Sequence, residues 1–305
     1  MLLKEFPDIH WLKSQIQTRF ENQITWDGRK LEQPGWPTVI LNTRAKKVLR
    51  ENISGPLSIF TTVSGNSSVA VQARQVKVNE NTFFISNPNQ EYTLSIPNEA
   101  ETFNIHVGEK MGAEIWHDAT HANHYLLDYP LEISTSPELH NRVHWRDASF
   151  NSIVRQLACA DGQTQEEELL GDLIFLLLDE KIRSTKRSEG IQAIKSATRE
   201  EITRRLHLAA DLIYSHFDKN LSLDDLSQVS CLSKFHFIRL FKEYFHESPH
   251  QFITRIRLEK SVSYLKNSNY GVKEISQKVG MENSSSFSRL FRNHFGVYPT
   301  QFAQA

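Results

Sequence analysis

Two arginines near the end of the chain occupy equivalent positions in a duplicated segment. Residues 237–242 read Phe-Ile-Arg-Leu-Phe-Lys and return at 287–292 as Phe-Ser-Arg-Leu-Phe-Arg, so Arg239 corresponds to Arg289. A guanidinium presents its N–H donors in a planar fork, which can pair with O6 and N7 of guanine or with a phosphate. The residue type and its repetition therefore indicate recognition of nucleic acid at two places.

The duplication covers a helix, a turn and a second helix. Segments 223–228, 237–242 and 249–252 return as 272–277, 287–292 and 299–302, at an offset of 49 and then 50 residues. A repeat of this length marks a structural unit. In the first unit we expect a support helix over 224–229, a turn, and a second helix from Lys234 capped by Ser233. Two such helix-turn-helix units predict binding to DNA.

The second helix of each unit turns its apolar positions inward and leaves the other side chains for DNA. Candidate DNA-binding residues are Lys234, Phe235, His236, Ile238, Arg239 and Lys242 in the first unit, and Ser284, Ser285, Ser286, Ser288, Arg289 and Arg292 in the second. Because the second set is mostly serine, we expect the first unit to discriminate sequence and the second to anchor. A long helix from Pro249 would separate the two by about 34 Å, one turn of DNA.

The N-terminal part of the chain has the pattern of short strands. Six segments are rich in β-branched and aromatic residues, at 38–41, 57–63, 68–72, 81–86, 92–96 and 102–107. Such spacing predicts a small antiparallel sandwich or barrel. In the last segment Phe103, Ile105 and Val107 alternate with Asn104 and His106, which predicts one buried face and one polar face.

A hollow barrel of this kind would hold a small molecule, whereas a solid one would not. Ligand pockets combine apolar walls with a few polar atoms. The candidate lining residues are Trp36, Tyr92, Asn104, His106 and Trp116. The alternative is that the aromatic residues form core and the polar groups face water, and the sequence leaves both open.

Three histidines could face one side of a helix as metal ligands, namely His117, His121 and His124. Neither a Glu directly after the first His, which a metalloprotease helix requires, nor a Cys ligand accompanies them. We therefore predict no metal and no cofactor. No nucleophile and base, carboxylate pair or phosphate loop stands out, so no catalytic residue is assigned and the chain is not expected to be an enzyme. A metal-dependent enzyme on the β-rich part is the remaining alternative.

Composition is that of an ordinary globular protein large enough for two domains, with 305 residues, 39% hydrophobic and 23% charged. Cys159 and Cys231 are the two cysteines, so no disulfide framework is expected. The N-terminus lacks a secretory signal and no run of 18 apolar residues occurs, which predicts a cytoplasmic protein without a membrane partner. Charge is unevenly distributed along the chain. From Arg199 onward there are 15 Lys and Arg and 11 Asp and Glu, whereas the preceding residues contain 20 Lys and Arg and 25 Asp and Glu.

The residues between the two parts are helical. A helix over 166–178 has an apolar surface wider than one stripe, which predicts burial against its own domain and, as the alternative, also against a second copy in a homodimer. The polar segment 183–197 then predicts a linker. The expected domains are 1–182, 183–197 as the linker, and 198–305.

Six motifs follow one another through the last domain. They are Arg-Leu-Phe-Lys at 239–242, Ser-Pro-His-Gln-Phe-Ile at 248–253, Arg-Leu-Glu-Lys at 257–260, Ile-Ser-Gln-Lys-Val-Gly at 275–280, Phe-Ser-Arg-Leu-Phe-Arg at 287–292 and Phe-Gly-Val-Tyr-Pro-Thr at 295–300. In this order and spacing they resemble the DNA-binding domain of AraC/XylS-type transcriptional regulators. Cys231 departs from the family, which has glycine at that turn, and the arginine usual after Phe302 is absent.

The resemblance implies an α+β chain with an N-terminal cupin-like antiparallel β-barrel followed by helices, and a C-terminal all-α domain with two helix-turn-helix units. It also implies a seven-helix domain that binds promoter DNA and recruits or positions RNA polymerase. We therefore expect a sequence-specific transcriptional regulator whose N-terminal sensor and dimerisation domain binds a small-molecule effector. The alternative is a constitutive regulator whose N-terminal domain serves dimerisation alone.

Overall fold

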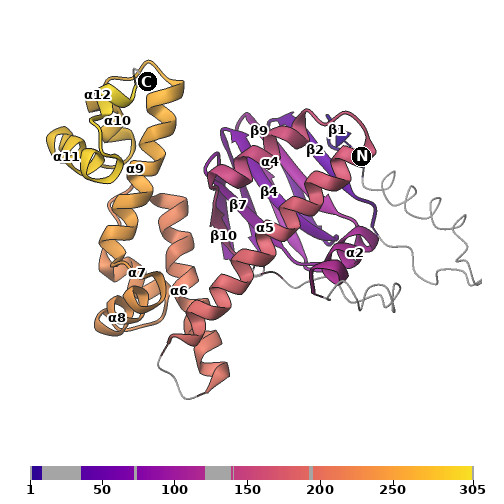
Figure 1. Cartoon of the computed structure of the whole chain (residues 1–305), viewed down its shortest axis with the longest axis horizontal. Coiled ribbons are helices and arrows are strands. Elements are labelled where there is room, and N and C mark those ends of the chain that lie inside the picture. The colour runs from indigo at the N-terminus through magenta and orange to yellow at the C-terminus, as the bar shows by residue number, and fades with distance from the viewer. Residues whose placement is uncertain are drawn as a thin grey trace, which may run out of the picture. The chain divides into compact units, whose positions relative to one another are not determined.

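The computed structural model describes residues 2–8, 36–71, 74–120, 139, 141–191 and 195–303. The chain divides into two compact units, Met1–Ile182 and Arg183–Ala305, which are described separately below. The first unit combines β-sheets with helices and the second is helical, so the chain as a whole is α+β (Figure 1).

Hydrogen bonds join the described strands of the first unit into two sheets and not into one closed barrel. One sheet has the order β1 (Leu2–Leu3), β2 (Val39–Ala45), β9 (Ala100–Val107), β4 (Leu57–Ser64), β7 (Thr82–Ser86) and β10 (Val143–Trp145). The other has the order β3 (Val48–Ile53), β8 (Tyr92–Ile96), β5 (Asn66–Val71) and β6 (Arg74–Asn79). Neighbouring strands run antiparallel except β1 and β2, which are parallel. Of the two predicted forms, an antiparallel sandwich or a barrel, the two sheets fit the sandwich, apart from the parallel pairing of β1 with β2. The cupin-like barrel implied by the resemblance is not confirmed for the described strands.

Both faces of the six-stranded sheet are covered. Because side chains alternate along a strand, Phe103, Ile105 and Val107 of β9 join a core with α4 (Ala148–Ala158) and α5 (Gln163–Glu189), and Figure 1 shows these helices crossing that face. Asn104 and His106 point the other way, into the sandwich. Asn104 is 1% exposed and its Oδ1 accepts a hydrogen bond from Thr61 N at 3.2 Å, so this polar side of the strand does not face water.

The wide apolar surface of α5 is buried mainly within its own unit. Leu170, Leu173 and Leu177 are buried in the core beneath the sheet. Phe175 and Ile182, seven residues apart, stay 47% and 55% exposed. The short helix α2 (Glu109–Thr120) packs at the edge of the same core.

The second unit holds the end of α5 and, in its described part, seven further helices. These are α6 (Ser196–His216), α7 (Leu223–Val229), α8 (Lys234–Phe245), α9 (Pro249–Asn267), α10 (Val272–Lys278), α11 (Ser284–Phe295) and α12 (Pro299–Phe302). Polar side chains begin four of them, because Ser222, Ser233, Ser248 and Asn283 each accept a hydrogen bond from the first turn. Of the segment 183–197, the first seven residues continue α5 as helix. No helix in the described ranges has both the length and the apolar character needed to cross a bilayer.

Candidate functional site

Helix α8 presents a continuous exposed face to solvent. Phe237, Leu240 and Phe241 are buried against the other helices of the unit. Of the predicted DNA-binding residues, those that are exposed are Lys234, Phe235, His236, Arg239 and Lys242, while Ile238 is partly buried. Phe235 is 89% exposed, which is unusual for so large an apolar side chain. A thymine methyl group in the major groove is a suitable contact for such a ring.

An acidic neighbour already holds one of these side chains. Lys234 Nζ lies 2.6 Å from Asp224 Oδ1 of α7. Both side chains are well exposed, so the pair is weak and can exchange for a phosphate contact. Arg239 and Lys242 have no such partner among the described residues, so they are the readily available cations of this helix.

The turns between the paired helices have the same geometry in both units. Leu232 N donates to Ser227 O at 3.0 Å in the first, and Met281 N donates to Ser276 O at 2.8 Å in the second. The residue before each donor has a left-handed backbone, with φ of +50° at Cys231. The duplicated sequence therefore folds into a duplicated structure.

Helix α11 borders a basic groove. A surface depression of about 580 Å³ lies between the start of α10 and the exposed side of α11. Its lining residues are Val272, Lys273, Ser284, Ser285, Ser288, Arg289, Arg292, Asn293 and Tyr298. They include three cations and no acid. An anion such as a DNA phosphate suits this charge.

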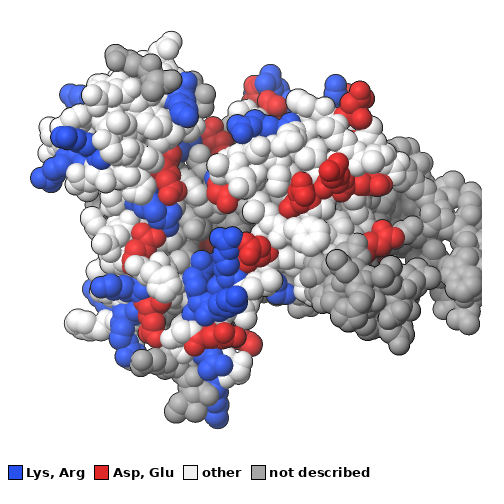
Figure 2. Space-filling view, in the orientation of Figure 1, with Lys and Arg blue, Asp and Glu red and all other residues white. Residues whose placement is uncertain are grey.

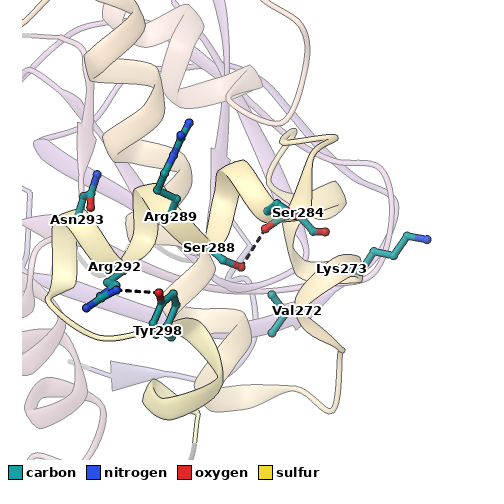
Figure 3. Close-up of a pocket in the computed structure, with 9 residues that line it drawn as sticks. Val272, Lys273, Ser284, Ser288, Arg289, Arg292, Asn293 and Tyr298 are labelled. Carbon is teal, nitrogen blue, oxygen red and sulfur yellow. Dashed lines mark hydrogen bonds between the residues drawn. The ribbon is translucent and has the colours of Figure 1, made fainter.

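Hydrogen bonds fix part of this groove. Arg292 donates from its NH1 nitrogen to Tyr298 Oη at 2.8 Å, with its guanidinium carbon 4.7 Å from the ring centre (Figure 3). Ser288 donates to Ser284 O at 2.9 Å within its own helix, which occupies its hydrogen. Arg289 is exposed, whereas three of the four predicted serines are partly buried and Ser285 is exposed. Figure 2 shows Lys and Arg gathered over the helices α10 to α12 and again near α7 and α8.

A junction around Arg257 joins the two helix-turn-helix units. From α9, its guanidinium donates to Phe217 O and Lys219 O, both at 2.7 Å, just after α6. Gly280, in the turn of the second unit, packs so closely here that an added Cβ would lie 2.6 Å from Asp218 O. The frame between the two recognition helices is therefore tightly packed.

Tyr244 ties the back of α8 to two other helices. It is fully buried, and its hydroxyl lies 2.6 Å from Ser184 Oγ at the end of α5 and 2.8 Å from His207 Nε2 of α6. Arg187 of α5 lies over its ring at 5.6 Å. The repeat equivalent in α11 is His294, which is exposed. The first recognition helix thus has an attachment to α5 that the second lacks.

A second candidate site lies inside the first unit, between its two sheets. The cavity measures about 80 Å³. Its lining residues are Phe6, Pro7, Trp36, Pro37, Val39, Leu41, Arg50, Ile53, Ser54, Gly55, Pro56, Phe60, Tyr92, Leu94 and His106. Trp36, Tyr92 and His106 of the predicted pocket are among them. Asn104 is buried beside the cavity without lining it, and Trp116 packs on the helix-covered side, with Lys181 Nζ 5.7 Å from its ring.

Two polar groups at this cavity, Tyr92 and His106, are neutral near pH 7. Burial lowers the pKa of His106 to about 4 and raises the pKa of Tyr92 to about 12. Ser58 Oγ lies 2.8 Å from Pro56 O and 2.8 Å from His106 Nδ1, and it also hydrogen-bonds with Tyr92. Ser58 therefore links the two titratable groups Tyr92 and His106 on this side of the cavity.

The predicted absence of a metal site remains a prediction. His121, His124 and the side chain of His117 lie outside the described residues. Within the described ranges no group of three His, Cys, Asp or Glu side chains could hold a metal ion.

Sequence reasoning missed residues at both sites. Arg50 lies on β3, a strand that the sequence pattern did not indicate, because Leu49, Glu51 and Asn52 break the apolar alternation. Lys273 and Tyr298 were missed because contacts with DNA were expected from the residues of α11 alone. Their positions in the repeat, Lys273 at the start of α10 and Tyr298 next to Pro299, could have indicated that they lie beside α11.

Comparison with known proteins finds one family model and several curated regulators that are similar to parts of this chain. A family model described as a helix-turn-helix domain matches residues 226–305. The "Probable transcriptional regulator LumQ" of Photobacterium leiognathi is 27% identical over 214 residues, which cover 68% of this chain and 84% of LumQ. The "Raffinose operon transcriptional regulatory protein RafR" of Pediococcus pentosaceus is 28% identical over 137 residues, 45% of this chain and 47% of RafR. Two further curated relatives, from Haemophilus influenzae and Streptococcus mutans, are matched over about a third of their own length.

Among solved structures, the C-terminal domain of AraT, a response regulator from Geobacillus stearothermophilus, is 27% identical, covers 33% of this chain and 84% of that chain, and gives a TM-score of 0.32. The range that the family model matches includes most of α7 and all of the helices from α8 to α12. Residues 226–305 thus carry a helix-turn-helix domain, and the chain is similar to known transcriptional regulators.

Proposed function

We propose that the protein is a sequence-specific DNA-binding transcriptional regulator. The observation that carries the proposal is the pair of recognition helices, α8 and α11, each with an exposed cationic face and both held by α9. In the first, Arg239 and Lys242 are exposed next to Phe235. In the second, Arg289 and Arg292 border a groove without acidic residues. Arginine can read guanine, and all four cations can hold phosphates.

Selection of bound sequences from a random DNA library by the full chain tests this proposal. Enrichment of a motif with two parts, about one DNA turn apart, is the expected result, because each recognition helix would enter its own major groove. Arg239→Ala should weaken binding to the selected sequence by roughly 1–3 kcal/mol and relax base preference at one position. The matched control is Arg204→Ala, which changes an exposed arginine of α6 that lies outside both helix-turn-helix units. A library that shows no enrichment contradicts the proposal.

For the first unit we propose a cupin-like sensor domain that binds a small-molecule effector. The cavity between the sheets supports this role, because it has aromatic and aliphatic walls and a few placed polar groups. Thermal shift of the full chain against a small-molecule library tests for an effector. A constitutive regulator would show no stabilising compound and unchanged DNA binding.

Promoter DNA, RNA polymerase and a second copy of the chain are the proposed macromolecular partners. The homodimer has support from Phe175 and Ile182, which leave an exposed apolar stripe on α5. Sedimentation of the wild-type chain and of Phe175→Lys tests it: a dimer that the substitution dissociates is expected, and a wild-type monomer contradicts the proposal.

A further inference from the structure

The two helix-turn-helix units differ in charge at equivalent positions around their recognition helices. The nine residues that line the groove beside α11 include the cations Lys273, Arg289 and Arg292 and no acid. At the nine equivalent positions of the first helix-turn-helix unit the repeat places three cations and two acids, in the set Leu223, Asp224, Lys234, Phe235, Ile238, Arg239, Lys242, Glu243 and Ser248. The same surface is therefore more strongly cationic in the second helix-turn-helix unit.

Small side chains open the groove beside α11. Its lining includes three serines, and the equivalent positions of the first helix-turn-helix unit carry Lys234, Phe235 and Ile238. A serine side chain fills much less space than any of these three. The resulting depression of about 580 Å³ has room for a phosphate group of the DNA backbone.

One position on the support helices carries opposite charges in the two helix-turn-helix units. Asp224 is the second residue of α7, and Lys273 is the second residue of α10. Asp224 Oδ1 lies 2.6 Å from Nζ of Lys234, the first residue of α8. Ser284, the equivalent of Lys234, is the first residue of α11 and lines the groove together with Lys273. An acid thus holds a cation in the first case, whereas a cation lies beside a neutral residue in the second.

The amino group of Lys273 is available to an anion from outside the protein. Its side chain is exposed, and in Figure 3 it points away from the other labelled residues. Among the residues that the structure describes, no acidic side chain forms an ion pair with it. Asp224, in contrast, neutralises Lys234 and adds a negative charge that repels a phosphate.

We infer that the groove of the second helix-turn-helix unit binds a backbone phosphate of DNA through Lys273, and that Asp224 closes the equivalent place in the first by holding Lys234. This inference rests on the proposed DNA-binding function. It adds that a single position of the repeat sets which of the two units binds the DNA backbone at this place.

Salt titration of DNA binding by the full chain tests both parts of the inference. Affinity for the selected sequence and for a random duplex of equal length is measured between about 50 and 200 mM salt. Lys273→Ala should reduce the slope of log affinity against log salt by about 1 on both duplexes, because one phosphate contact is lost. Lys234→Ala should leave the slope nearly unchanged, because Asp224 already neutralises this lysine.

Removal of the acid should have the opposite effect. Asp224→Asn should release Lys234 and increase the slope by about 1, and adding Lys234→Ala to this variant should cancel the increase. The matched control is Asp218→Asn, which opens another exposed pair, to Lys219 at 3.5 Å, outside both helix-turn-helix units and should leave the slope unchanged. Every substituted side chain is exposed, so these variants should fold as the wild type does.

An unchanged slope for Lys273→Ala overturns the phosphate site. A slope that falls with Lys234→Ala alone overturns the role of Asp224, as does a slope for Asp224→Asn that is no steeper than for Asp218→Asn. If the wild-type chain still prefers the selected sequence to the random duplex, such results contradict the assignment of these residues and leave the proposed function standing. If the wild-type chain has no such preference, the proposed function itself falls.

Discussion

Single residues distinguish the two otherwise similar helix-turn-helix units. Cys231 and His246 of the first helix-turn-helix unit adopt a left-handed backbone, with φ of +50° and +60°. The equivalent residues of the second helix-turn-helix unit are Gly280 and Gly296. Such a backbone costs a residue with a Cβ about 1 kcal/mol relative to glycine. Cys231→Gly should therefore raise the free energy of unfolding of the helical part of the chain, Arg183–Ala305, by about 1 kcal/mol in urea titrations. Gly280→Ala is the opposite control, because its Cβ would meet Asp218 O at 2.6 Å. A destabilised Cys231→Gly variant would contradict the assignment of strain.

His106 gives the first unit a pH dependence. Burial lowers its folded-state pKa to about 4, below the ordinary 6.5, so the unfolded chain takes up the proton first as the pH falls. The stabilisation is complete above pH 6.5 and is lost down to pH 4, by up to about 3 kcal/mol. Tyr92 and Arg50 line the same cavity, and the pKa of Tyr92, raised to about 12, keeps that group outside this range. Unfolding of the wild type and of His106→Gln across this window should diverge. An NMR titration that places the His106 pKa near 6.5 would exclude this cause.

At the scale of elements, the end of α5 is part of the DNA-binding unit. Tyr244 of α8 holds Ser184 and His207 through its hydroxyl, at 2.6 Å and 2.8 Å. Tyr244→Phe keeps the ring and removes the hydroxyl that Ser184 and His207 contact. The free energy of unfolding of the helical part, Arg183–Ala305, should therefore fall by about 1–2 kcal/mol. Tyr270→Phe, at a 43% exposed tyrosine, should change little. Chemical denaturation of the helical part measures the free energy of unfolding of both variants. Equal losses for Tyr244→Phe and Tyr270→Phe would mean that the buried hydroxyl of Tyr244 makes no specific contribution to stability.

Local patterns predicted some elements well and others not at all. Capping residues and apolar spacing indicate α7, α8 and α11 closely, because a helix is made of contacts within a few residues. The segment 92–96 coincides with β8. β3 was missed because Leu49, Glu51 and Asn52 break its apolar alternation and its pairing is with the distant β8. β6 was missed because Val76 and Val78 are its two apolar residues, although it pairs with the adjacent β5. Arg50 lies on β3, so its place at the cavity depends on strand pairing that local spacing does not encode.

At the scale of the whole molecule, charge is unevenly divided between the two parts of the chain. From Arg199 onward the balance is +4, and the preceding residues carry −5, so attraction to DNA must come from the second unit. A phosphate contact releases counterions and makes affinity fall with salt. Lys242→Ala should weaken binding on all sequences and reduce the slope of log affinity against log salt by about 1. Lys46→Ala makes the same change in net charge on the exposed surface of the first unit and should leave the slope unchanged. If both variants shift the slope equally, net charge governs the interaction and the exposed face of α8 does not; if neither does, Lys242 touches no phosphate.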